Sequence, residues 1–229
     1  MERDVDMKEI SDGKLYGSKD MVKADCQDCV GCWECCHGMG ESIVLDPLDV
    51  FRLLEAVKGS FDGLVQKHLE LGIVDGMVLP NLKMDEKTEN CTFLDSHGRC
   101  SIHENRPGIC RLFPLGRFYE NRSFQYFLQV HECKKRNRVK IKVCKWIDTP
   151  DVKQYETFVT DWHYFLKDLK ALVDAEGDEE QRRMVTMYVL KRFYQRPYDQ
   201  GREFYPQFEE RMLEAKQLFG LMTEQGAVP

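Results

Sequence analysis

Ten cysteines dominate the chemistry open to this 229-residue chain, and all of them lie between Cys26 and Cys144. Five fall within eleven residues, in the run CQDCVGCWECC: Cys26, Cys29, Cys32, Cys35 and Cys36. A Cys-x-x-Cys turn brings two sulfurs to one metal ion while backbone N–H groups offset their charge. Crowded thiolates repel one another, and metal binding removes that penalty and releases the thiol protons. The spacing therefore predicts a metal site.

A second group of cysteines lies farther along the chain, in turn-rich segments that suit ligands delivered by loops: Cys91, Cys100, Cys110 and Cys133. Cysteine also acts as a small buried hydrophobic residue, and we expect that role for two of these four at most. Four thiolates saturate one tetrahedral zinc ion or one 4Fe–4S cluster, so eight or more ligands require two centres or one larger centre. Because side chains of adjacent residues project differently, we expect Cys35 and Cys36 to serve different irons or different sites.

The three-residue spacing of the first group favours iron over zinc. It is similar to the Cys-x2-Cys-x2-Cys run of bacterial ferredoxins, whose fourth ligand is remote, although no Cys-Pro follows here. We therefore expect iron–sulfur clusters of the 4Fe–4S type. Zinc is the alternative cofactor, and it would make the region a structural or interaction module.

Four other polar residues accompany the cysteines. His37 and His103 are candidates for a metal ligand, a proton carrier or a hydrogen-bond donor to a ligand, but thiols are plentiful and we do not expect direct ligation by either. Arg106 and Arg111 are placed to neutralise an anionic thiolate centre or to pair with nearby carboxylates.

Three motifs occur in a fixed order. They are Cys29-x-x-Cys32-x-x-Cys35-Cys36, then Ile-x-Leu-x-x-x-Asp-Val-x-Arg-Leu over residues 43–53, then Cys91-x-Phe-Leu…Gly98-x-Cys100-x-Ile-His103-x-x-Arg106-Pro107-x-x-Cys110-Arg111-x-Phe-Pro114. Over residues 29–133 they resemble the YkgJ-type CxxCxxCC family, described as a zinc- or iron-chelating domain and often as an iron–sulfur protein. The resemblance implies eight shared ligands: Cys29, Cys32, Cys35, Cys36, Cys91, Cys100, Cys110 and Cys133. Cys26 and Cys144 lie outside the pattern, so they complete a further metal site or are spare thiols.

Some members of that family are labelled flagellin lysine N-methylases, which implies a protein methyltransferase as an alternative function. The chain has no glycine-rich nucleotide or S-adenosylmethionine loop after a strand, and no Cys-x3-Cys-x2-Cys of radical enzymes. We therefore expect redox or electron-transfer work ahead of methyl transfer, with metal storage or sensing as a third function. The partner would be a redox protein or a protein substrate, and whether the chain is an enzyme stays open.

The composition is that of an ordinary globular protein, with 42% hydrophobic residues. The first 25 residues contain no apolar run of signal-peptide or membrane-spanning length, so we expect a cytoplasmic protein with reduced thiols and no membrane contact. The net charge of −6 argues against nucleic-acid binding. One segment is strongly basic, with seven cations in twelve residues: Lys134, Lys135, Arg136, Arg138, Lys140, Lys142 and Lys145. Its alternation with apolar residues predicts a strand with a basic outer face.

The elements that must position the cysteines follow from capping signals and periodicity. Residues 43–45 are typical of a short strand, and Asp46-Pro47 predicts a helix over residues 47–57. Ser60 predicts the cap of a second helix that ends at Gly72. Short strands and turns are expected over residues 73–144, with a hairpin formed by residues 116–119 and 123–128.

Beyond residue 150 the apolar residues recur at helical spacing, and two further helices are expected near residues 179–194 and 203–222. We expect this aromatic stripe to form core. The sequence thus predicts an α+β protein: a lead-in segment at residues 1–25, a small irregular cysteine-rich metal-binding domain with short strands and helices at 26–148, and a helical C-terminal subdomain packing on it at 149–229.

Overall fold

A computed structural model of the chain describes residues 6–26, 32–135, 137–176 and 179–222. The strands are β1 (Ser11–Tyr16), β2 (Met21–Asp25), β3 (Leu69–Val74), β4 (Met77–Leu82), β5 (Leu115–Glu120), β6 (Ser123–Gln129) and β7 (Val139–Lys142). The α-helices are α1 (Met7–Ile10), α2 (Pro47–Val57), α3 (Phe61–Lys67), α4 (Gly108–Leu112), α5 (Val143–Ile147), α6 (Val152–Glu176), α7 (Glu179–Leu190) and α8 (Phe204–Leu218). Short 3-10 turns form η1 (Glu34–Cys36), η2 (Gly40–Ser42) and η3 (His103–Asn105), and a π-helix forms η4 (Lys191–Gln195).

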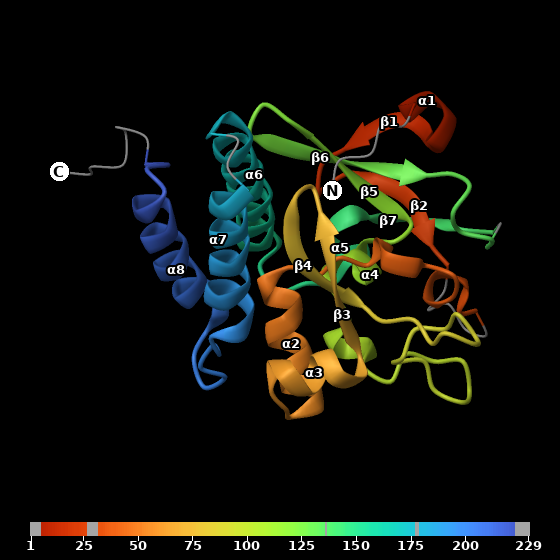
Figure 1. Cartoon of the computed structure of the whole chain (residues 1–229). Coiled ribbons are helices and arrows are strands. Elements are labelled where there is room, and N and C mark those ends of the chain that lie inside the picture. Colours follow the sequence, from red (N-terminus) through yellow and green to blue (C-terminus); the bar gives the residue numbers. More distant parts are fainter. Residues whose placement is uncertain (1–5, 27–31, 136, 177–178, 223–229) are drawn as a thin grey trace.

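Helices α6, α7 and α8 gather on one side of the molecule, and most of the short strands lie on the other (Figure 1). The strands form three small antiparallel sheets with the orders β1-β6-β5, β2-β7 and β3-β4. This segregation of helices from small sheets confirms the predicted α+β class.

The two strands before Cys26 pair with strands far along the chain. In β1, Ser11 lies opposite Gln129 of β6, and in β2, Met21 lies opposite Lys142 of β7. Strands β1 and β2 of the expected lead-in segment therefore belong to two of the three sheets of the cysteine-rich part.

Helix α2 begins where the sequence predicts. Asp46 Oδ1 accepts a hydrogen bond from the Asp49 N–H at 2.9 Å, Asp49 Oδ2 accepts one from the Asp46 N–H at 3.1 Å, and Pro47 occupies the first turn. The cap of α3 is confirmed as well, because Ser60 Oγ accepts from the Gly63 N–H at 3.2 Å.

The end of the second predicted helix is wrong. Helix α3 stops at Lys67, and Gly72 lies in strand β3 opposite Leu79 of β4. Both turn residues between these strands, Asp75 and Gly76, have positive φ, which is the geometry of a tight hairpin turn. Residues 69–74 therefore pair with β4 as a strand and do not extend the helix. The strand expected at residues 43–45 is reduced to a single bridge between Val44 and Asn81.

The hairpin prediction is confirmed, because strands β5 and β6 pair around Asn121 and Arg122, both of which have positive φ. The prediction for the basic segment is confirmed in part. Residues 139–142 form β7 with exposed Lys140 and Lys142, but Val139 is also exposed, and from Val143 the chain is helical in α5.

The helical part has an aromatic core. The stripe predicted beyond residue 150 lies on α6, where Phe158 and Trp162 are buried. Phe158 meets Phe208 of α8 with ring centroids 4.6 Å apart, and Trp162 meets Phe193 of η4 at 5.0 Å. Helix α7 ends earlier than predicted because the chain changes to a π-helix at Lys191. None of the described helices is long and apolar enough to cross a membrane.

Candidate metal centre

Five of the ten cysteines interact with one another from three segments of the chain. We call them the thiol cluster: Cys35 and Cys36 of η1, Cys91 and Cys100 at the two ends of a loop, and Cys110 of α4. Each interacts electrostatically with at least one other member, and Cys110 does so with Cys35, Cys36, Cys91 and Cys100. The structure thus joins members of both sequence groups at one place.

Backbone hydrogen bonds hold the first group against the second. The Cys91 N–H donates to the Cys36 carbonyl oxygen at 2.7 Å, and the Gly38 N–H donates to that of Glu89 at 2.9 Å. Between these bonds, His37 forms an antiparallel bridge with Asn90. Because these bonds involve backbone groups alone, the juxtaposition of Cys36 and Cys91 is part of the fold.

The loop from Cys91 to Cys100 is closed on itself. Leu94 and Cys100 form an antiparallel bridge, and the Asp95 carboxylate accepts hydrogen bonds from two backbone N–H groups inside the loop. Gly98 has a φ of +71°, and a Cβ there would lie 2.7 Å from the Trp33 ring. The glycine therefore lets Trp33, two residues before Cys35, pack directly on the loop that carries Cys100.

Helix α4, which carries Cys110, is held by a buried carboxylate. Asp49 of α2 is 2% exposed, and its Oδ1 accepts a hydrogen bond from the Gly108 N–H at 2.6 Å. On the other side of Gly108 lies Tyr155 of α6, whose hydroxyl accepts from Arg117 Nη2 at 2.7 Å. Gly108 thus connects α4, which carries the metal-ligand candidate Cys110, to the polar side chains Asp49 of α2, Arg117 of β5 and Tyr155 of α6.

The thiols of the cluster have unequal acidities. A hydrogen bond from the Cys36 thiol, helped by the charge of Arg106, lowers the pKa of Cys35 to about 7. The same hydrogen bond raises the pKa of Cys36, and burial raises the pKa values of Cys91 and Cys100. Burial also raises the pKa of Cys110 well above its ordinary value. Cys35 is therefore the thiol that ionises first, and a bound cation would have to displace protons from the others.

The accompanying polar residues take different roles. His37 Nδ1 lies 3.0 Å from Asn90 Oδ1, and His103 Nε2 contacts the Arg106 guanidinium. The charge of Arg106 also offsets part of the rise that burial causes in the pKa of Cys100. Arg111 is instead consumed by backbone carbonyl oxygens, including that of Asp148 at 2.7 Å from Nη1. The neutralising role predicted for both arginines therefore has support for Arg106 alone.

Among the described residues, no contact given above ties the thiols of Cys32, Cys133 or Cys144 to the cluster. Cys29 lies outside the described residues. Cys32 precedes η1 and is half-buried, Cys26 is buried at the end of β2, Cys144 lies in α5, and Cys133 follows β6. An ion pair between Lys134 and Glu34 brings the Cys133 segment to η1. None of the described cysteines forms a disulfide.

The donor chemistry of the cluster fits a metal, whereas its present geometry is more open than a metal site. Across the described ranges, no three His, Cys, Asp or Glu side chains already stand in a metal-binding arrangement. Thiolates are the soft ligands that zinc and iron–sulfur clusters take. Binding would therefore draw the thiols together as they lose their protons.

Sequence reasoning did not find Asp49 or Gly108. The position of Asp49, three residues after the cap of α2, predicts a hydrogen bond between its side chain and the backbone of Asp46. That bond uses only one of its two carboxylate oxygens. The second oxygen reaches Gly108, 59 residues away in sequence, and no local pattern predicts that contact.

One comparison with known proteins gave a match. Residues 28–145 match the family model CxxCxxCC, described as a "putative zinc- or iron-chelating domain". The matched stretch is slightly more than half of the chain and contains the whole thiol cluster. No curated protein and no solved structure matches the chain.

Proposed function

This chain belongs to the CxxCxxCC family of zinc- or iron-chelating domains, and from that premise we propose that it binds an iron–sulfur cluster and serves in electron transfer or another redox reaction. The observation that supports the proposal is the thiol cluster, because five cysteines from η1, α4 and the loop from Cys91 to Cys100 interact electrostatically with one another, and cysteine thiolates are the ligands of iron–sulfur clusters. When bound, the cluster would supply the one-electron chemistry.

The protein's own residues contribute charge and enclosure. Arg106 favours the anionic forms of Cys35 and Cys100, which offsets the repulsion among thiolates. Cys91 is buried, while the other members of the cluster are half-buried. A centre held there would be shielded from bulk water but would remain near enough to the surface to exchange electrons.

The basic segment is the docking face that we propose for a redox protein in the cytoplasm. Its strand β7 lies at the edge of a two-stranded sheet, and Lys134 reaches Glu34 of η1, next to Cys35. Arg136 lies outside the described residues. An acidic partner seated on this face would approach the thiol cluster, and its association rate would fall as salt is added.

Zinc is the second candidate cofactor, and one observation favours it. Since the five thiols come from three segments, a single ion would cross-link η1, the loop between Cys91 and Cys100, and α4. Cross-linking of this kind is the usual task of structural zinc. The protein would then be a structural or interaction module without redox chemistry.

Anaerobic purification separates the two cofactors. Iron–sulfur binding predicts a brown protein with broad visible absorption, iron and acid-labile sulfide in equal amounts, and bleaching on reduction. A colourless protein with stoichiometric zinc and no sulfide would reject the iron–sulfur proposal and establish the structural module. Saturable S-adenosylmethionine binding with methylation of protein lysines would instead favour the methyltransferase alternative.

Substitution tests the ligand assignment. Cys36→Ser should remove the metal of one centre, because Cys36 is hydrogen-bonded to Cys35 and interacts with Cys91 and Cys110. Cys144→Ser is the matched control, since Cys144 is half-buried in α5 and no described contact links its thiol to the cluster. A Cys36→Ser variant with the metal content of the unaltered protein would show that Cys36 is not a ligand.

A further inference from the structure

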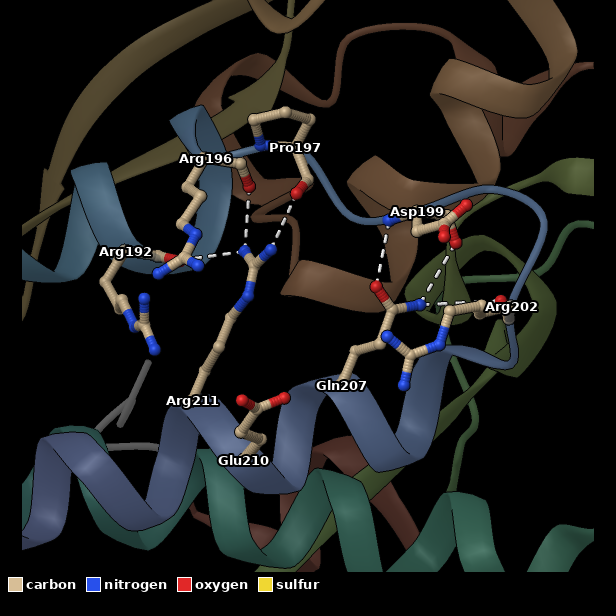
Figure 2. A pocket seen from close by; sticks show the side chains of 8 residues that line it. All are labelled: Arg192, Arg196, Pro197, Asp199, Arg202, Gln207, Glu210 and Arg211. Atoms are coloured by element: carbon tan, nitrogen blue, oxygen red, sulfur yellow. Dashed lines mark hydrogen bonds between the residues drawn. The ribbon is translucent and has the colours of Figure 1, made fainter.

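A cavity of about 260 Å³ lies in the helical part, outside the thiol cluster. It is lined by the end of the π-helix η4, the loop that follows it and one face of α8: Arg192, Arg196, Pro197, Asp199, Arg202, Gln207, Glu210 and Arg211 (Figure 2). Four of the eight lining residues are arginines and two are acidic. An excess of guanidinium groups around one hollow is unusual in a chain whose net charge is −6.

Two side chains of α8 fix the wall of this cavity. Gln207 Oε1 accepts from the Asp199 N–H at 2.9 Å, and Gln207 Nε2 donates to the carbonyl oxygens of Asp199 and Glu203, each at 3.0 Å. One turn later, Arg211 Nη1 donates to the carbonyl oxygens of Arg192 and Arg196 at 2.9 and 2.7 Å. Figure 2 shows both side chains reaching from the helix into the loop. The loop is therefore tied in place, and its shape does not depend on a ligand.

The buried charge of Arg211 has no carboxylate hydrogen-bonded to it. Arg211 is 6% exposed, its described hydrogen bonds go to backbone carbonyl oxygens, and its guanidinium lies 3.6 Å from the centre of the Tyr198 ring. Burial and the neighbouring charge of Arg192 lower the pKa of Arg211. An anion in the cavity would relieve this repulsion.

The cavity also offers donors without partners. Arg192 pairs with Glu214 through Nη2, but its Nε is buried and has no hydrogen-bond partner in the described structure. Arg196 and Arg202 are exposed at the rim, and among the described residues their guanidinium groups make no hydrogen bond or ion pair, which leaves them available to a ligand. In Figure 2, Arg196 and Arg202 lie at opposite ends of the cavity, with Gln207 and Arg211 between them. An anion with two charged heads could engage both ends at once.

We propose that this arginine-lined cavity is a binding site for a diphosphate group, either free or carried by an organic molecule. Guanidinium groups form bidentate hydrogen bonds with phosphate oxygens. In a diphosphate, one phosphate group would bind the guanidinium of Arg196 and the other would bind that of Arg202. At about 30 Å³ for each water, the cavity has room for roughly nine waters, which is small for an organic ligand and sufficient for two phosphates. The carboxylate of Glu210 opposes binding, and Asp199 Oδ1 is partly engaged by the Gly201 N–H at 2.9 Å.

Calorimetric titration of the metal-loaded full chain with pyrophosphate tests the site. We expect saturable binding that weakens with added salt, and at least about tenfold weaker binding for the double variant Arg196→Gln/Arg202→Gln, given the loss of two bidentate pairs. Glu210→Gln should bind more tightly, because it removes a negative charge from the lining. Arg183→Gln, at an exposed position of α7, is the matched control and should bind as the unaltered protein does.

These arms also exclude trivial results. Pyrophosphate that merely extracted the metal would affect the arginine variants and the Arg183→Gln control equally, which would overturn the proposal. Binding of ADP as tight as that of pyrophosphate would assign the site to a diphosphate carried by an organic molecule, whereas binding of pyrophosphate alone would assign it to the free ion. Absence of saturable binding at millimolar pyrophosphate, or citrate binding as tightly, would refute a diphosphate site.

Discussion

Gly108→Ala should destabilise the protein although alanine is the better helix former. An added Cβ would lie 2.3 Å from the Tyr155 hydroxyl oxygen and 3.5 Å from Asp49 Oδ1. Overpacking of this kind costs about 1–3 kcal/mol. If the ring of Tyr155 moves to make room, its hydrogen bond with the Arg117 guanidinium is lost, at a further cost of about 1.5–3 kcal/mol. Alanine returns about 0.5–1 kcal/mol through helix propensity, so we expect a net loss of about 1.5–5.5 kcal/mol.

Urea unfolding followed by far-ultraviolet circular dichroism measures this loss as a shift of the midpoint at constant slope. Gly63→Ala is the matched control with the opposite expected sign. Gly63 is also helical, but its Cβ would meet only Ser60 Oγ at 3.4 Å, so we expect a gain of about 0.5–1 kcal/mol.

The same substitution reports on the metal centre. Cys110 lies two residues after Gly108 in α4, so displacement of this helix would also move Cys110. The metal content should therefore fall in Gly108→Ala and not in Gly63→Ala. If both variants were equally stable and equally loaded, the contact between Gly108 and Tyr155 would not be what positions Cys110, and the reasoning would be refuted.

Three further predictions concern buried ionisable groups. In metal-free protein at pH 7, iodoacetamide should modify Cys35 before Cys110, because the pKa of Cys35 is about 7 whereas burial raises the pKa of Cys110. Peptide mass spectrometry measures the rate of labelling at each cysteine, and faster labelling of Cys110 would contradict the prediction. Asp46→Asn should raise the free energy of unfolding at pH 8 and change it little at pH 4. Burial raises the pKa of Asp46 to about 8, so the folded state loses stability as this carboxyl ionises between pH 4 and pH 8. Urea unfolding at both pH values tests this, and a difference between variant and unaltered protein that is the same at pH 4 and pH 8 would contradict it. Arg117→Met should cost about 3–5 kcal/mol by removing the buried guanidinium beside Asp46 and Asp49, and the cost should shrink in the Asp46→Asn background, a coupling that a double-mutant cycle measures.

The sequence predicted elements whose signals are local. Helix α2 has its cap, its proline and its apolar stripe within twelve residues, so distant contacts do not change its start. The hairpin of β5 and β6 likewise depends on a two-residue turn between aromatic strands. In contrast, Gly72 carries a signal that fits both a helix end and a strand, and the hairpin turn at Asp75 and Gly76 decides in favour of the strand.

The sequence predicted the type of ligand at the candidate site, but not which cysteines come together there. Spacing predicts that the cysteines bind metal, but which of them meet depends on backbone bonds such as the one from Cys91 to Cys36. The polar support of Cys110 depends on a contact between α2 and α4 that neither segment predicts alone. The arginines of the helical cavity gave no motif at all, because Arg192 and Arg211 are brought together by the packing of α8 against η4.

The pairing of β1 with β6 and of β2 with β7 has a consequence for the newly made chain. The first two strands leave the ribosome long before their partners, and at about 5–20 residues per second β2 waits roughly 6–25 s for Lys142. During that interval the first cysteine group has neither its sheet nor the second group beside it. Its thiols are then open to premature metal capture or oxidation, so these cysteines are least protected in the interval before β7 is made.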